Sequence, residues 1–101
     1  MEGSTNTFKR VEKESLDRYH FPPQEILEGK EAIDLRKQAL HRATSLGNLH
    51  KHKVLIRFFD DQGAKEVYTT IWAITDNKVL LKAGRLIPVH RIFSVVIGYA
   101  S

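Results

Sequence analysis

The sequence predicts an α+β fold in which an N-terminal helix packs on a small, bent barrel of five largely antiparallel strands. Apolar residues follow a helical spacing over residues 31–46 and then alternate with other residues from Lys53 onward. The closing segment, residues 82–97, combines a glycine turn, a strand ended by Pro88, one tight turn and a hydrophobic strand. A last strand of this kind must pair with earlier strands, so we expect the strands to close into a barrel.

Length and charge divide the chain into two parts. With 101 residues it has room for one domain and one core. Residues 1–34 carry five Lys or Arg and eight Asp or Glu, whereas residues 35–101 carry eleven and four. We therefore expect residues 1–22 to be an acidic, partly disordered arm and residues 23–101 to be the folded domain. The lack of cysteine and of a long apolar run predicts a cytoplasmic protein that binds no membrane.

The helix is expected over Glu31–Leu46. At about 100° per residue, five apolar residues point in nearly one direction and are expected to face the core: Ala32, Leu35, Ala39, Ala43 and Leu46. Gly47 follows at a position that favours a helix end. Pro23 suits the first residue of a separate short helix, and Gly29 is expected to interrupt the two.

Hairpins connect the expected strands, which are Val54–Phe59, Val67–Thr75, Lys78–Lys82, Arg85–Ile87 and Phe93–Ile97. Asp60–Gly63 is a turn by composition. The second strand is long for a small protein, so it is expected to bend. Val89–Ile92 suits one 3₁₀ turn, which would place Ile92 in the core and leave His90 and Arg91 at the rim.

This order of elements resembles the Sm-like and SH3-like small barrels, in particular the bacterial RNA chaperone of the Sm family. The resemblance covers residues 31–97 and implies RNA binding. Separately, residues 84–95 read G-R-L-I-P-V-H-R-I-F-S-V. That segment is similar to the G-x-x-I-P-x-H-R-I-x-x-I ending of a small family of uncharacterised proteins, relatives of which are attached to RNA-processing enzymes as RNA-end recognition modules.

The positive charge of residues 35–101 favours a polyanionic partner, although a basic surface that is merely solvated is an alternative. The candidate nucleic-acid-binding residues are Lys51, Lys53, Arg57, Trp72, Lys82, Arg85, His90 and Arg91. Five rings could either stack on bases or fill the core: Phe58, Phe59, Tyr68, Trp72 and Phe93. The leading hypothesis is a non-catalytic module that binds nucleic acid, with RNA favoured. The alternative is a protein-interaction or self-association domain that uses open strand edges.

Neither a cofactor nor an enzymatic reaction is expected. His50, His52 and His90 could together hold zinc, but no carboxylate or thiolate accompanies them in a metal-binding spacing, and solvated histidines are the alternative. Asp60 and Asp61 are more typical of a turn than of an acid/base pair. The sequence contains no nucleophile elbow, phosphate loop or dinucleotide motif.

Overall fold

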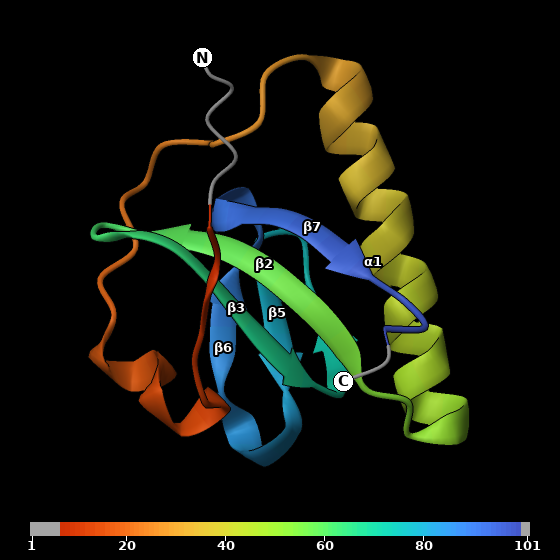
Figure 1. Ribbon diagram of the computed structural model, residues 1–101. Coiled ribbons are helices and arrows are strands. Elements are labelled where there is room, and N and C mark those ends of the chain that lie inside the picture. Colours follow the sequence, from red (N-terminus) through yellow and green to blue (C-terminus); the bar gives the residue numbers. More distant parts are fainter. Residues whose placement is uncertain (1–6, 100–101) are drawn as a thin grey trace.

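The computed structural model describes residues 7–99 and has one long helix and two small sheets, so the α+β class is confirmed (Figure 1). The helix α1 spans Lys30–His50, and β1 (Lys9–Arg10) and the 3₁₀ helix η1 (Lys13–Arg18) precede it. The strands after it are β2 (Val54–Asp60), β3 (Gly63–Thr69), β4 (Ile71–Ile74), β5 (Lys78–Leu81), β6 (Leu86–Pro88) and β7 (Ile92–Val96). Two single 3₁₀ turns, η2 (Lys82–Gly84) and η3 (Val89–Arg91), flank β6.

One bent stretch of chain joins the two sheets. The first sheet has the order β1-β3-β2-β7, with β1 parallel to β3 and the other pairs antiparallel. The second sheet is antiparallel and has the order β4-β5-β6. Only Thr70 separates β3 from β4, so the bend expected in the second strand is confirmed. At this bend the carbonyl oxygen of Thr70 accepts a hydrogen bond of 3.0 Å from the backbone N–H of Lys82.

The core contains side chains from α1, from both sheets and from the N-terminal stretch. Val54, Ile56 and Phe58 alternate along β2 and are fully buried, as their spacing predicts. Val11 and Leu16 belong to the same cluster, so the N-terminal stretch contributes to the core of the domain. The disorder expected at the start of the arm concerns Met1–Thr7, of which residues 1–6 lie outside the described residues.

The predictions for α1 were wrong in two respects. The helix continues past Gly47 to His50 and is capped by Lys51 in the left-handed conformation, with φ of 55°. Gly47 instead allows α1 to pack closely on β4, because a Cβ atom there would lie 2.2 Å from the carbonyl oxygen of Ile71. The buried residues of α1 are Arg36, Leu40, Ala43 and Gly47, so of the five residues expected to face the core only Ala43 is buried, and Leu35 is exposed. The search for apolar residues missed this face because it includes a charged residue and a glycine.

Candidate nucleic-acid interface

One face of the first sheet points away from the core and carries aromatic rings next to cations. Figure 1 views this sheet with the second sheet behind it, and α1 lies to one side. Along β2, Leu55, Arg57 and Phe59 alternate with the core residues and lie on this face, where Leu55 is covered and Arg57 and Phe59 are partly exposed. We call the surface the outer face and define it by Phe8, Arg10, Lys53, Arg57, Phe59, Glu66, Tyr68, Phe93 and Tyr99.

Three phenylalanine rings pack together at one end of the outer face. The ring centroids of Phe8 and Phe59 and those of Phe8 and Phe93 are 5.7 Å apart, and those of Phe59 and Phe93 are 6.0 Å apart. Phe93 is 45% exposed. The pairing of β2 with β7 shifts by one residue here, from Arg57 opposite Ser94 to Phe58 opposite Ile92. Phe93 is the extra residue of this bulge, which explains why a ring in a core-forming strand is turned to the surface.

Two of the three cations of the outer face flank a single carboxylate. Glu66 accepts hydrogen bonds of 3.1 Å from Arg57 and from Arg10, one on each oxygen. The guanidinium carbon of Arg57 also lies 5.2 Å from the centroid of the Phe8 ring. At the other end, the ammonium of Lys53 lies 5.7 Å from the centroid of the Tyr68 ring. Because three cations outnumber one acid, the outer face has a net positive charge, and its cations lie next to aromatic rings.

Arg57 and Lys53 are therefore the two predicted cations that lie on the outer face. Phe59, Tyr68 and Phe93 share their face, whereas Phe58 is fully buried in the core. The core interpretation thus holds for Phe58, while stacking by Phe59, Tyr68 and Phe93 stays a prediction. Four members of the outer face were neither predicted binding residues nor among the five predicted rings: Phe8, Arg10, Glu66 and Tyr99.

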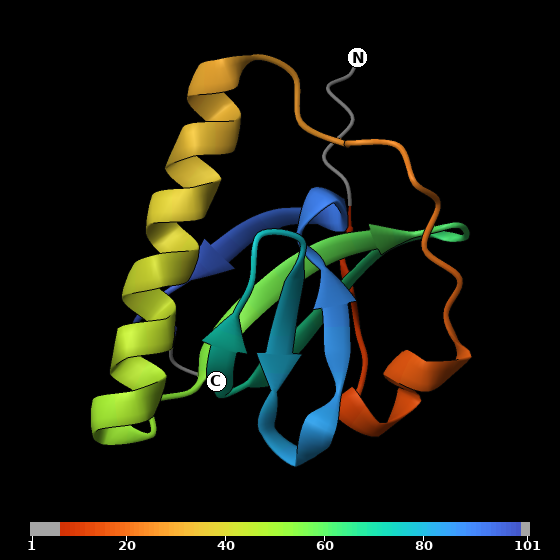
Figure 2. The same ribbon diagram turned by 180° about the vertical axis from the view of Figure 1, so that it is seen from behind.

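Lys51, Trp72 and Lys82 lie at a different place, where α1 ends. The side chain of Asn48, in the last turn of α1, donates a hydrogen bond of 3.0 Å to the carbonyl oxygen of Trp72. Figure 2 shows this end of α1 and the turn between β5 and β6 at the same end of the molecule. The three side chains are exposed, and among residues 7–99 neither lysine forms an ion pair.

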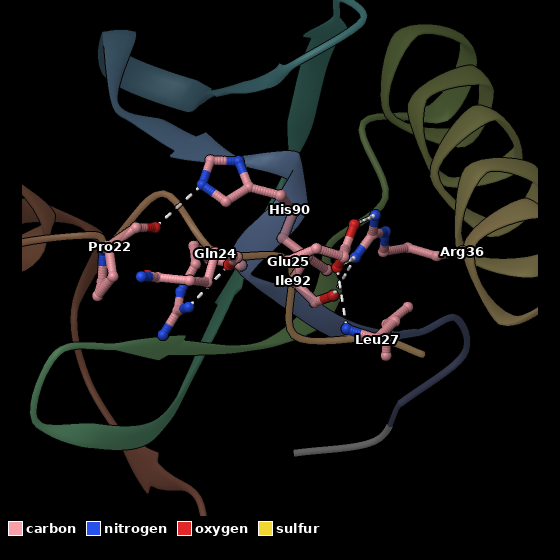
Figure 3. Close-up of polar contacts among 8 residues, drawn as sticks. Pro22, Gln24, Glu25, Leu27, Arg36, His90 and Ile92 are labelled. Atoms are coloured by element: carbon pink, nitrogen blue, oxygen red, sulfur yellow. Dashed lines mark hydrogen bonds and ion pairs between the residues drawn. The ribbon is translucent and has the colours of Figure 1, made fainter. Parts of the chain in front are cut away.

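Arg91 is not at the rim, and this prediction was wrong. It is 8% exposed, and its guanidinium donates hydrogen bonds of 2.9 Å to the carbonyl oxygens of Phe59 and Gln24, with a longer bond of 3.4 Å to that of Asp60. The Nε2 atom of His90 lies 3.0 Å from the carbonyl oxygen of Pro22 (Figure 3). The two side chains thus bind the backbone of residues 22–24, which would otherwise lack partners.

The segment before α1 has no short helix, contrary to the prediction from Pro23. It is irregular between η1 and α1, and Glu25 anchors it to the helix. Both oxygens of Glu25 accept hydrogen bonds from Arg36, at 2.6 and 2.7 Å, and the same guanidinium donates to the carbonyl oxygen of Ile92 at 3.1 Å (Figure 3). Arg36 thereby holds the pKa of Glu25 below its ordinary value.

Arg85 is also engaged within the protein. It forms an ion pair with Asp17 of the N-terminal stretch. Arg85, which was predicted to contact phosphate, is therefore already paired with an acid of the N-terminal arm. A pocket of about 490 Å³ lies between α1, the β4–β5 turn and η3, and its lining includes Arg36, Lys37 and His90.

Within residues 7–99, no three His, Asp or Glu side chains gather to hold a metal ion. The ring centroids of His50 and His52 are 6.0 Å apart, while His90 binds the segment before α1. No helix in the described part of the chain is long and apolar enough to cross a membrane. Comparison with known proteins found no matching family model and no match among curated proteins or solved structures.

Proposed function

We propose that this protein is a non-catalytic module that binds single-stranded nucleic acid on its outer face, with RNA as the favoured ligand. The observation that carries the proposal is the exposed ring of Phe93 beside Phe8 and Phe59, with Arg57 next to them. Stacking of one base on an aromatic side chain contributes about 1–3 kcal/mol and tolerates any base. Binding at such a face would therefore select single strands rather than a particular sequence.

Charge supports the same surface. Arg10, Lys53 and Arg57 are distributed along the outer face, and Glu66 neutralises only one of the three charges. A strand lying across the face would bring phosphates to these cations while its bases meet the rings. Lys51 lies two residues before Lys53 and would extend the positive path towards the end of α1.

The proposed fold is the small, bent SH3/Sm-like barrel expected from the sequence. Two observations support it: Thr70 alone separates the strands β3 and β4, and its carbonyl oxygen binds the backbone that follows β5. The two sheets would then be the two halves of one bent sheet. The preference for RNA over DNA rests on the resemblance to RNA-binding small barrels.

Fluorescence anisotropy tests the proposal, with labelled 12-nucleotide oligo(U), oligo(A) and oligo(dT) titrated over a series of salt concentrations. Each phosphate contact on a single strand contributes a slope of about −0.7 in log K against log salt, so three cations predict a slope of about −2. Phe93→Ala should weaken binding roughly tenfold through the loss of one stacking ring. The matched control is Leu86→Ala, since Leu86 is also half exposed but lies on the second sheet.

Three results would count against the proposal. Affinity that does not change with salt would point to the alternative, a protein-interaction domain. Equal losses for Phe93→Ala and Leu86→Ala would place the ligand elsewhere. Binding to double-stranded RNA that equals binding to single strands would exclude base stacking. Circular dichroism of each variant shows whether it is folded, so that a loss of binding is not confused with unfolding.

A further inference from the structure

The helix α1 carries a stripe of apolar residues on one flank of its buried face, next to the buried residues Arg36, Leu40, Ala43 and Gly47. Leu35 is 59% exposed and Leu49 is 75% exposed. They are 14 residues apart, which is about 21 Å along a helix. Half-buried Ala39 and Leu46 lie between them. Figures 1 and 2 both show α1 along one edge of the molecule, with no other described element on its outer side.

The spacing of this stripe is that of a helix pair. Leu35, Ala39, Arg42, Leu46 and Leu49 follow one another at intervals of 4, 3, 4 and 3 residues, which is the a and d pattern of a coiled coil. We call these five residues the outer stripe. Arg42 is its one charged member, and a polar residue in such a seam determines register and orientation. A helix face that contacts only solvent normally carries polar residues instead of apolar residues at this spacing.

The two ends of α1 differ in net charge. The acids Glu28, Glu31 and Asp34 are exposed near its start together with one cation, Lys30, and among residues 7–99 none of the three acids forms an ion pair. His50 and Lys51 are exposed at its other end, and Lys53 follows them. A second α1 that runs in the opposite direction would bring these acids next to these cations at both ends of the contact.

From this stripe and this charge division we propose that the protein self-associates through α1, which pairs antiparallel with α1 of a second copy. In an antiparallel pair each a residue faces a d residue of the other helix. Leu35 then packs against Leu46 of the second copy, and Arg42 lies over Ala39, whose small side chain leaves room for it. A parallel pair would bring Arg42 against Arg42 and acid against acid, which is unfavourable. The contact differs from the strand edges considered for self-association above.

Sedimentation velocity of the full chain over a range of protein concentrations tests the pairing, without nucleic acid. One helix pair is a small interface, so dimers should form progressively as concentration rises. Leu49→Glu should shift the midpoint of dimerisation to at least tenfold higher concentration. Leu86→Glu is the matched control, because Leu86 is 48% exposed but lies on β6, and it should behave as the unmodified protein. A monomer at every concentration, or a dimer lost only with Leu86→Glu, would overturn the proposal.

Cysteine cross-linking tests the orientation. The chain has no cysteine, so Leu35→Cys and Leu46→Cys each carry a single thiol. When the two variants are mixed under mild oxidation, an antiparallel pair should yield mainly the mixed disulfide between positions 35 and 46. A parallel pair would yield mainly the two symmetric disulfides. Predominance of symmetric disulfides, or equal yields with a single thiol at Lys37 (Lys37→Cys), on the pocket side of α1, would overturn the antiparallel arrangement.

Discussion

The substitution Gly47→Ala sets two physical effects against each other. In an isolated helix, alanine is more favourable than glycine by about 1 kcal/mol. In this protein the added Cβ would lie 2.2 Å from the carbonyl oxygen of Ile71 and 3.1 Å from the Cγ2 atom of Thr70. Real Cβ contacts are essentially never shorter than 3.0 Å, so α1 and β4 would have to separate by about 0.8 Å at this point. The neighbouring atom is backbone, which cannot rotate away.

Overpacking of this kind costs about 1–3 kcal/mol, occasionally more, and separation of the helix also loosens the contacts of Leu40 and Ala43. We expect a net destabilisation of about 2 kcal/mol, which corresponds to a drop in Tm of roughly 10 °C for a domain of this size. Urea and thermal unfolding followed by circular dichroism measure it. The control is Ser45→Ala, at an exposed position of the same helix, which should be neutral or slightly stabilising. A more stable Gly47→Ala protein would refute the close packing of α1 on β4.

Three further outcomes concern the buried residues Arg91, Ile92 and Asp60. Arg91→Ala should lower the free energy of unfolding by about 2–4 kcal/mol, since it leaves backbone carbonyls unpaired, and should leave nucleic-acid affinity unchanged when binding is measured on folded protein. Ile92→Ala should cost about 2–5 kcal/mol in urea unfolding. Burial raises the pKa of Asp60, but hydrogen bonds from Lys65 and two backbone N–H groups outweigh it, so that pKa lies below its ordinary value. The stabilisation from ionised Asp60 should therefore be complete at neutral pH and fall away as the pH drops below about 4, and Asp60→Asn should remove that part of the acid dependence in pH-dependent unfolding.

The strands were largely predictable because alternation is a local property. Val54, Ile56 and Phe58 are buried where their spacing places them, and each predicted strand overlaps an observed one. The start of β3 was not predictable in this way. Lys65 is charged, yet it is buried because it pairs with Asp60 at 2.8 Å. Partners of this kind are recognised only once the fold has brought them together.

The candidate site was partly predictable for the same reason. Arg57 and Phe59 alternate with core residues, so their exposure on one face follows from the sequence. Arg10 joins them because β1 pairs with β3 across a separation of 56 residues, and Phe8 comes with it. The opposite error was made for Arg91, which was expected at the surface because it is charged and is in fact buried. No local pattern indicates that a cation will bind buried carbonyl groups.

The segment Ile87–Ile92 illustrates how far a short motif can indicate function. Ile87 and Ile92 are fully buried, and Pro88 ends β6. His90 and Arg91 bind carbonyl oxygens of the segment before α1, so each of these five residues has a role in holding the fold together. A protein that shares the motif is therefore expected to share this turn and the irregular segment that it anchors. Ligand binding would depend on the outer-face residues, none of which stands at a specified position of the motif. Similarity in this segment is thus an argument about fold, and the Phe93→Ala and Leu86→Ala comparison is the experiment that addresses function.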